Sequence, residues 1–421
     1  MNLNYGISQR DRSANIWLMI PAFIRNKFAG VQQPLGRWIL RHILELIVLA
    51  PLLIFVIPWL KFRKKEVLLI GESSVISRFI APLEPEIRRR IVQGSLSCAI
   101  VLNLSADANS QVRKMYDKIV RIYGRERKIR RRLIWWASRL GVGYRLLIED
   151  KSDLLWQGTP ALHGFSTLEN IQGQKFLSDV GIQSGDPFIC YAVRTESYYL
   201  RLVEQGVTVK PRSVRNPNED MYLTALSRLI KNGLPVVRMG KDVEDAVDTK
   251  RFPNVIDYAK NFRTDYLDVF LLSHCKFLLV GNTGLFWVRA MFNKVTLHCD
   301  LYDIRHQVLT HDVMIFQKVF FKGENRIATI SEMLKMRSEY SDERHQARLG
   351  VELVKNTADE IFAACEGMNA RIESTWETTA EDEELQKRYL DLVIKYSDQP
   401  TWRGGGRVGT QFLRDNQDLL K

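Results

Sequence analysis

The stretch Lys276–Gly284, KFLLVGNTG, reads as a short buried strand that runs into a turn of small residues. Two similar apolar runs come before it, Pro187–Val193 (PFICYAV) and Leu234–Val237 (LPVV). An arginine follows each run directly, Arg194 in the first case and Arg238 in the second. In parallel α/β sheets, ligands bind beyond the carboxyl ends of the strands. Two arginines and a small-residue turn at such ends predict a site for a diphosphate.

The turn itself, Gly281-Asn282-Thr283-Gly284, has the composition of a phosphate-binding turn. Its glycines let the backbone approach an anion closely, and Thr283 adds a hydroxyl group. The apolar pattern that follows predicts a helix, opened by Asn282 or Thr283, whose N-terminus would offer unpaired N–H groups and a positive dipole end. The same residues also suit an ordinary strand-to-helix turn, and either arginine also suits an ordinary salt bridge. The prediction therefore depends on all these groups lying together.

Asp268 is a further candidate, because it lies on a predicted helix, Asp265–His274, fifteen residues before Thr283. An aspartate among apolar neighbours needs hydrogen-bond donors, which a nucleotide base or ribose would supply. The alternative is a carboxylate held near a helix N-terminus by the helix dipole. The sequence leaves both interpretations open.

Two sets of alternating strands and helices predict two α/β domains, as the length of 421 residues also does. The predicted strands of the first set are Lys65–Gly71, Leu96–Leu104 and Tyr144–Glu149, and the predicted helices are Gln111–Gly124 and Glu126–Leu140. The second set starts near residue 187 and includes an amphipathic helix, Glu219–Asn232, which Asn218 caps and Gly233 ends.

These patterns divide the chain into four predicted parts. Residues 1–65 form an anchor region, and residues 66–172 form a first α/β domain. Residues 173–330 form a second α/β domain, and residues 331–421 form a helical C-terminal extension.

The composition narrows the choice of ligand. The net charge of +13 suits a chain that binds nucleic acid, anionic lipid or phosphorylated ligands. Five scattered cysteines without a C-x-x-C pair indicate a reducing compartment and no zinc site. No D-x-D motif can be connected to the predicted diphosphate site, so we predict neither a metal ion nor a cofactor.

The most apolar stretch, Ile43–Leu60, predicts contact with a membrane. It has 18 residues, which is near the lower limit for crossing a bilayer, and it contains Glu45, Pro51 and Pro58. Lysines and arginines flank both ends, so the charges give no clear orientation. A kinked, half-inserted anchor, a full span and a buried core helix all remain open.

Residues 121–139, RIYGRERKIRRRLIWWASR, contain seven arginines, one lysine and a pair of tryptophans, Trp135 and Trp136. Such a segment suits the anionic headgroup region of a membrane. The alternatives are nucleic-acid binding, which no recognised motif supports, and a solvated basic helix. We expect an anionic membrane surface to be the partner, and no nucleic acid.

Several stretches resemble bacterial glycosyltransferases of surface-polysaccharide clusters, which are distantly similar to the α1,6-fucosyltransferase and protein O-fucosyltransferase group. The matching pieces are 213–222 (SVRNPNEDMY), 234–240 (LPVVRMG), 255–259 (VIDYA), 262–285, 321–326 (FKGENR), 356–368 and 409–420. The resemblance implies a GT-B-like fold, with two Rossmann-like domains facing a cleft. It also implies a membrane-associated enzyme at the cytoplasmic face of the bacterial inner membrane.

The resemblance also implies roles for individual residues. Arg194 matches the arginine of an H-x-R motif that grips the donor pyrophosphate, although Ala192 replaces the histidine of that motif. Asp268 matches an aspartate that contacts the base, and Thr283 with Gly284 matches the residues that contact the phosphates. Further residues expected to bind the donor are Arg215, which lies inside the first matching piece, and Arg238, Gly281 and Asn282.

The expected reaction is metal-independent transfer of a sugar from a nucleoside-diphosphate donor to a glycan, with a lipid-linked acceptor held by the first domain. Arg194 and Arg238 would stabilise the departing diphosphate. Glu72 and Glu196 are the candidate bases for the acceptor hydroxyl. The alternative is a non-catalytic nucleotide- or glycan-binding membrane protein with the same fold. The sequence does not determine the oligomeric state.

Overall fold

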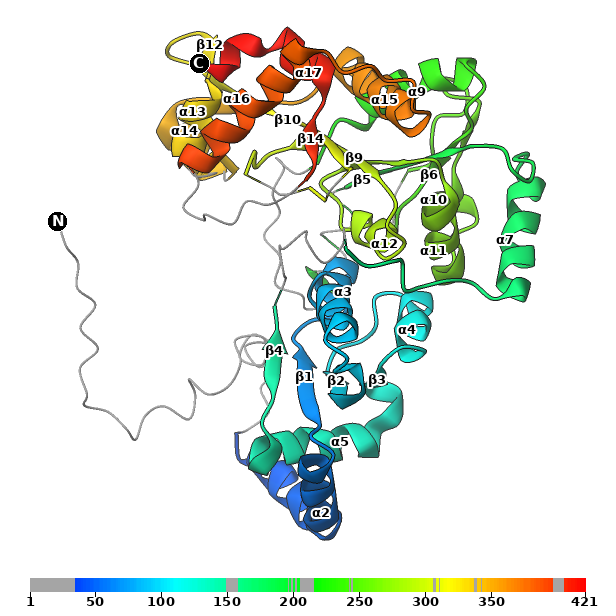
Figure 1. Ribbon diagram of the computed structural model, residues 1–421, viewed down its shortest axis with the longest axis vertical. Helices are drawn as coiled ribbons and strands as arrows, with labels where there is room; N and C mark the ends of the chain where they lie inside the picture. Colours follow the sequence, from blue (N-terminus) through cyan, green and yellow to red (C-terminus); the bar gives the residue numbers. More distant parts are fainter. Residues whose placement is uncertain are drawn as a thin grey trace, which may run out of the picture.

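The protein consists of two α/β units stacked along its long axis, as the computed structural model in Figure 1 shows. The described residues are 35–148, 158–195, 197, 200, 203–204, 216–241, 243, 245–305, 308–309, 311–336, 339–341, 343–396 and 405–421. The predicted α/β class is confirmed, and each unit has its own parallel sheet. This is the GT-B-like arrangement of two units that the sequence predicted.

The first unit contains a four-stranded parallel sheet in the order β3-β2-β1-β4. The strands are β1 (Glu66–Ile70), β2 (Ala99–Asn103), β3 (Arg121–Tyr123) and β4 (Arg145–Leu147). The helices are α3 (Ile76–Val92), α4 (Ser110–Asp117) and α5 (Lys128–Ala137). The predicted helix at 111–124 is wrong in its second half, because the chain leaves α4 at Asp117 and adds β3 to the sheet edge.

The second unit contains a seven-stranded parallel sheet in the order β14-β10-β9-β8-β5-β6-β7. Its strands are β5 (Ile189–Val193), β6 (Val236–Arg238), β7 (Val255–Ile256), β8 (Leu278–Gly281), β9 (Thr296–Leu301), β10 (Val313–Phe316) and β14 (Arg407–Val408). When these strands are numbered in chain order, the sheet reads 3-2-1-4-5-6-7 from β7 to β14, and its first six strands have the order of dinucleotide-binding folds. The four strands of the first unit repeat its beginning, 3-2-1-4.

Helices cover the faces of this larger sheet. They are α7 (Thr167–Asp179), α9 (Glu219–Lys231), α10 (Tyr258–Asn261), α11 (Asp265–His274) and α12 (Phe286–Ala290). The helix predicted at 265–274 is confirmed at both ends. The predicted cap is also confirmed, since the side chain of Asn218 accepts a hydrogen bond from the backbone N–H of Asp220, and Gly233 follows α9 with a φ of +85°.

Residues beyond 330 pack on the second unit. The helices are α13 (Ile330–Lys335), α14 (Glu343–Leu349), α15 (Ala358–Ile372), α16 (Ala380–Tyr396) and α17 (Thr410–Asp415). This part also supplies β14 to the large sheet and β13 (Val351–Val354) to a small antiparallel sheet with β11 (Lys318–Phe321) and β12 (Arg326–Ile327). The predicted boundary at residue 330 stays a prediction.

The apolar stretch near the N-terminus is a helix, α2 (Leu35–Phe62), that continues through Pro51 and Pro58. Among the described residues, its part Arg41–Phe62 is the one helix long and apolar enough to cross a membrane. Figure 1 shows α2 at the end of the first unit that faces away from the second unit. It packs against α5.

The two units meet through α3 and α4, which contact α12 and α11 respectively. One buried apolar cluster runs through both units, and it includes Ile70 and Phe79 from the first and Cys190 and Val280 from the second. A large apolar interface of this kind holds two domains in a fixed relation.

Candidate active site

A cavity of about 370 Å³ lies between the two units, at the carboxyl ends of both sheets. From the first unit it is lined by Gly71 and Glu72, which follow β1, and by the end of β4. From the second unit it is lined by Arg194, which follows β5, and by the turn 282–284, which follows β8. In both sheets these are the two strands where the strand order reverses, and this reversal creates the crevice in which open α/β sheets bind ligands.

A second cavity, of about 110 Å³, adjoins the first. Four lining residues are common to both cavities: Ser77, Arg194, Thr283 and Gly284. The second cavity extends toward Asp268 and Arg263. The two cavities are therefore adjoining parts of one cleft, and Arg194 and Thr283 lie where they meet.

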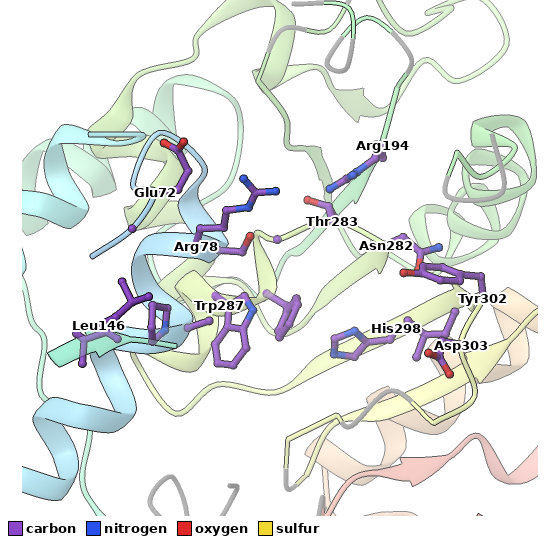
Figure 2. A pocket seen from close by; sticks show the side chains of 18 residues that line it. Glu72, Arg78, Leu146, Arg194, Asn282, Thr283, Trp287, His298, Tyr302 and Asp303 are labelled. Carbon is purple, nitrogen blue, oxygen red and sulfur yellow. The ribbon is translucent and has the colours of Figure 1, made fainter. Parts of the chain in front are cut away.

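Arg194 and the turn 281–284 are brought together as the sequence predicted. Arg194 is half-buried at the end of β5, and β5 pairs with β8 up to the register Val193↔Gly281. Figure 2 shows Arg78 and Arg194 reaching toward the space beside Thr283, one from each unit. An anion at this position would face two guanidinium groups.

Arg238 is not part of this group. Its guanidinium forms ion pairs with Glu219 at 2.9 Å and Asp257 at 3.3 Å, and it donates to the backbone carbonyl of Asp245 at 2.7 Å. The side chain is buried, and it lines neither cavity. The physical reason is its strand: β6 lies one position beyond β5 in the sheet, away from the reversal in strand order.

The helix dipole at the cleft comes from a different helix than predicted. The helix after the turn, α12, begins only at Phe286 and has five residues, so its dipole would stabilise an anion only weakly. α3 has 17 residues, and its first residues, Ile76 and Ser77, line the second cavity. In the described part of the chain, no hydrogen-bond acceptor is found for the backbone N–H groups of residues 76–78, and the first turn holds no acidic residue.

Arg78 adds a cation to this helix end. Its side chain is exposed in the larger cavity and makes no hydrogen bond or ion pair with any described residue. Unpaired N–H groups, the positive end of a long helix and an arginine together favour an anion. No sequence pattern predicts this contribution, because Pro82 and Pro85 count against a helix there.

The turn residues have structural roles as well. Asn282 has a φ of +53°, and its side-chain amide donates to the backbone carbonyl of Asp300 at 2.6 Å. A Cβ atom on Gly284 would lie 2.8 Å from Cβ of Ser77. Glycine at 284 is therefore required by the close approach of α3, whatever the ligand. The hydroxyl of Thr283 accepts from the N–H of Leu285 at 3.3 Å and faces the cleft.

Asp268 is buried beside the second cavity. Its carboxylate accepts hydrogen bonds from Arg263 at 2.7 Å and from the hydroxyl of Tyr258 at 2.9 Å. Burial raises the pKa of Asp268 to about 6, although the charge of Arg263 and the hydrogen bond from Tyr258 act in the opposite direction. The Nε atom of Arg263 is buried and has no hydrogen-bond partner among the described residues. Both residues line the second cavity, so a ligand there would meet a carboxylate and a guanidinium group.

Two groups with acid–base chemistry line the larger cavity. The carboxylate of Glu72 accepts hydrogen bonds from the backbone N–H and the hydroxyl of Ser74, at 3.1 and 2.5 Å. His298, on β9, is hydrogen-bonded through Nε2 to Asp312 at 3.2 Å, and burial raises the pKa of Asp312. His298 carries no sequence signal, since its partner lies 14 residues further along.

The remaining predicted site residues, Glu196 and Arg215, lie outside the described residues. In the part of the chain that the structure describes, no group of three or more His, Cys, Asp or Glu side chains could hold a metal ion.

Comparison with known proteins gives distant structural matches alone. A scan of protein-family models finds no match, and neither does a search of curated proteins. One match is Escherichia coli ADP-heptose lps heptosyltransferase II. The match covers 55% of this chain and 84% of the heptosyltransferase chain, with 16% sequence identity and a TM-score of 0.37. A glycosyl transferase of family 9 from Veillonella parvula DSM 2008 matches 60% and 86%, with 10% identity and a TM-score of 0.40.

A third solved structure, the E. coli heptosyltransferase WaaC with ADP-2-deoxy-2-fluoro heptose, matches 60% of this chain and 92% of its own. Its identity is 10% and its TM-score is 0.34. Likeness at this level says nothing of the substrate of this chain. The predicted resemblance to the fucosyltransferase group stays a prediction.

Proposed function

We propose that this protein is a glycosyltransferase that transfers a sugar from a nucleoside-diphosphate donor to a hydroxyl group of a glycan. One observation carries the proposal: two cavities meet at Arg194 and Thr283, where the strand-order reversals of two parallel sheets face each other. A nucleotide sugar has the matching shape, because a diphosphate joins two larger groups.

In this proposal each part of the donor has its own place. The diphosphate lies where the two cavities meet, between Arg194, the turn 282–284 and the N-terminus of α3. The nucleoside lies in the narrower cavity, where Asp268 and Arg263 provide an acceptor and a donor. The sugar and the acceptor glycan share the larger cavity, which the first unit completes with Glu72.

The chemistry follows from charge. The bond between the anomeric carbon and the diphosphate oxygen breaks, and a new bond forms from that carbon to the acceptor oxygen. Negative charge then grows on the departing diphosphate, which Arg78 and Arg194 can reach and where the helix fixes the first N–H groups of α3 in advance. Fixed donors of this kind typically make the largest contribution to catalysis. We propose that these groups serve in place of a metal ion.

The acceptor hydroxyl loses its proton in the same reaction. Glu72 is our first candidate for the base, since it is a half-exposed carboxylate in the larger cavity. His298, oriented by Asp312, is the second candidate. Replacing each by glutamine and recording the pH dependence of turnover distinguishes them.

The setting that we propose is the cytoplasmic face of a bacterial inner membrane, in the synthesis of surface polysaccharide. α2 and the basic segment around α5 would hold the enzyme there. β1 joins the end of α2 to the cleft and spans about 17 Å for its five residues. A lipid-linked acceptor would therefore need an extended glycan headgroup to reach Glu72.

The test begins with ligand binding. Purified full-length protein is heated with UDP-, GDP-, CMP- and TDP-sugars and with ADP-sugars, because a bound ligand raises the melting temperature by mass action. We expect one nucleoside diphosphate to stabilise the protein and the matching monophosphate to have a smaller effect. Arg194→Ala removes the stabilisation, whereas Arg251→Ala, on the surface of the second unit and paired with Asp220, retains it.

Turnover decides between the two functions that the sequence left open. Release of the nucleoside diphosphate by the wild-type protein, absent in Arg194→Ala, supports the transferase. Binding without hydrolysis or transfer supports a non-catalytic binding protein, an alternative favoured by Ala192, which lines the second cavity where the related motif has histidine. If no nucleotide binds, both the glycosyltransferase and the nucleotide-binding protein are excluded.

A further inference from the structure

α2 has two different faces, and both are apolar. One face packs on the first unit through every third or fourth residue, and Leu49, Leu53 and Leu60 are buried there. They belong to one cluster with Val67 and Leu69 of β1, Ile100 and Leu102 of β2, and Ile134 and Ala137 of α5. The opposite face carries side chains that nothing in the described part of the chain covers. Val48, Phe55 and Phe62 are 73%, 75% and 83% exposed.

This exposed face is too large for a surface in water. Ile43, Leu44, Ile47, Leu52, Ile54 and Trp59 also lie about half or more exposed on α2. Contiguous apolar patches of this kind mark sites of protein or membrane contact. A full span would carry the part of the protein that packs on the inner face of α2, from Glu45 to Leu60, to the depth of the hydrocarbon core.

The polar neighbour of α2 decides its orientation. Glu45 forms an ion pair with Arg132 of α5 at 2.9 Å, and the two helices pack together. Any position of α2 in a membrane therefore also fixes the position of α5. Arg125, Lys128, Arg130 and Arg139, in and around α5, are exposed. A helix that crossed the bilayer would draw these cations into the hydrocarbon, where charged side chains are strongly disfavoured. A helix in the plane of the surface leaves them among the headgroups.

The charge of the chain is concentrated in the same place. Residues 41–65 and 121–139 together contain 13 lysines and arginines and two glutamates, a net charge of +11, whereas the whole chain carries +13. Almost all of the excess positive charge therefore lies on the helix with the exposed apolar face and on the segment packed against it. Apolar contact beside dense positive charge is the chemistry of an anionic lipid surface.

We propose that α2 lies in the plane of an anionic phospholipid bilayer, with the face of Val48, Phe55 and Phe62 among the acyl chains and the cations of residues 121–139 at the phosphates. α2 is thus an in-plane anchor and not a transmembrane span. The sequence left a half-inserted anchor and a full span both open. It does not depend on the glycosyltransferase activity, and its test uses no nucleotide.

The first experiment measures the depth of the exposed face. Val48, Phe55 and Phe62 are spaced by seven residues and lie on the same face, so each is replaced by cysteine in turn and spin-labelled in the full-length chain. Cys98, which is half-buried, is first replaced by serine, and the other four cysteines are buried. The labelled proteins bind vesicles of phosphatidylcholine with 30% phosphatidylglycerol, and collision with oxygen and a nickel chelate reports the depth.

An in-plane helix places the three labels at the same shallow depth. A spanning helix moves the label by about 10 Å per seven residues, or about 21 Å from position 48 to position 62. Equal depths support the proposal, and a graded series overturns it.

The second experiment measures lipid selectivity. The full-length protein should float with the anionic vesicles and bind pure phosphatidylcholine vesicles far more weakly. Neutralising Arg130 and Arg139 together should weaken binding to anionic vesicles by about 25-fold, which is fivefold per arginine. The matched control is the pair Arg228→Gln and Arg251→Gln on the second unit, which should change nothing.

Two outcomes of the flotation experiment would overturn the proposal. Equal binding to neutral and anionic vesicles would remove the role of the cations. Failure to bind any vesicle would show another occupant on the exposed face, either residues 1–34 of the same chain in a monomer or a second copy in a dimer. Sedimentation in detergent-free buffer separates those two cases.

Discussion

Strands β5 and β6 are neighbours in the large sheet, and each ends at an arginine, yet the two arginines have opposite surroundings. Arg194 lines both cavities of the cleft. Arg238 is buried among Glu219, Asp257 and a backbone carbonyl. The difference comes from topology: β5 borders the reversal in strand order, and β6 lies one strand further away. An arginine at a strand end is therefore in a position to meet a ligand only when its strand borders the crevice.

The largest effect is expected for Arg238, and it concerns stability. Arg238→Ala leaves Asp257 buried without its cation, and removing one partner of a buried ion pair typically lowers the free energy of unfolding by about 3–5 kcal/mol. Urea unfolding followed by tryptophan fluorescence measures the loss. Arg251→Ala is the control, since its exposed pair with Asp220 contributes less than about 1 kcal/mol. A stable Arg238→Ala protein that no longer binds nucleotide would reverse our assignment of the two arginines.

Arg194 should show the opposite behaviour. Arg194→Ala is expected to lower kcat/KM for the donor by about 10²- to 10³-fold, as the loss of one fixed donor to a transition-state charge does in other enzymes. The melting temperature without ligand should stay within a few degrees of the wild type. Arg194→Lys keeps the charge but loses the forked geometry, so its activity should lie between the two. Equal losses of stability in the Arg194 and Arg238 variants would show that both arginines are structural.

The sequence predicted the parts of the fold that depend on local pattern. β5 and β8 follow from apolar runs of β-branched and aromatic residues, and α11 follows from an apolar helical pattern. The sequence also predicted that Arg194 lies close to the turn 282–284, because parallel strands that are adjacent end at the same edge of the sheet.

The contribution of α3 could not be predicted in the same way. Pro82 and Pro85 lie inside this helix, and proline ordinarily breaks a helix interior. Burial of Phe79, Ile80 and Leu83 against both units outweighs that local cost. The partners of Arg238 were equally hidden, since Glu219 and Asp257 each lie 19 residues away in the chain. Tertiary contacts of this kind leave no local pattern.

A third prediction concerns how the first unit closes the cleft beside Arg194. Gly284→Ala places a Cβ atom 2.8 Å from Cβ of Ser77, so α3 must shift or the turn must. Overpacking of this kind typically costs about 1–3 kcal/mol, and here it should also weaken nucleotide binding. Ser77→Gly removes the obstacle, and the double variant should recover most of the loss. A double variant no better than Gly284→Ala alone would show that the glycine serves the ligand and not the packing of α3.

Asp268 combines features of the two arginines, because it is buried in hydrogen bonds like Arg238 and yet lines a cavity like Arg194. Burial raises the pKa of Asp268 to about 6. If its carboxylate accepts a hydrogen bond from the nucleoside, about one tenth of the protein is competent at pH 5, so nucleotide affinity should fall about tenfold from pH 7 to pH 5.

The stability of the free protein should have the opposite slope. An aspartate whose pKa is higher in the folded state than its usual value of about 3.9 stabilises the fold below pH 4, and that contribution is lost as the pH rises through 6. Asp268→Asn should remove both dependences, and calorimetric titration with thermal unfolding from pH 4 to pH 8 records them. The contrary outcome is an Asp268→Asn variant that loses the pH dependence of stability and keeps the full pH dependence of nucleotide affinity. That outcome would show that Asp268, like Arg238, is a structural residue of the core. Arg263 would then be the nucleoside contact in that cavity.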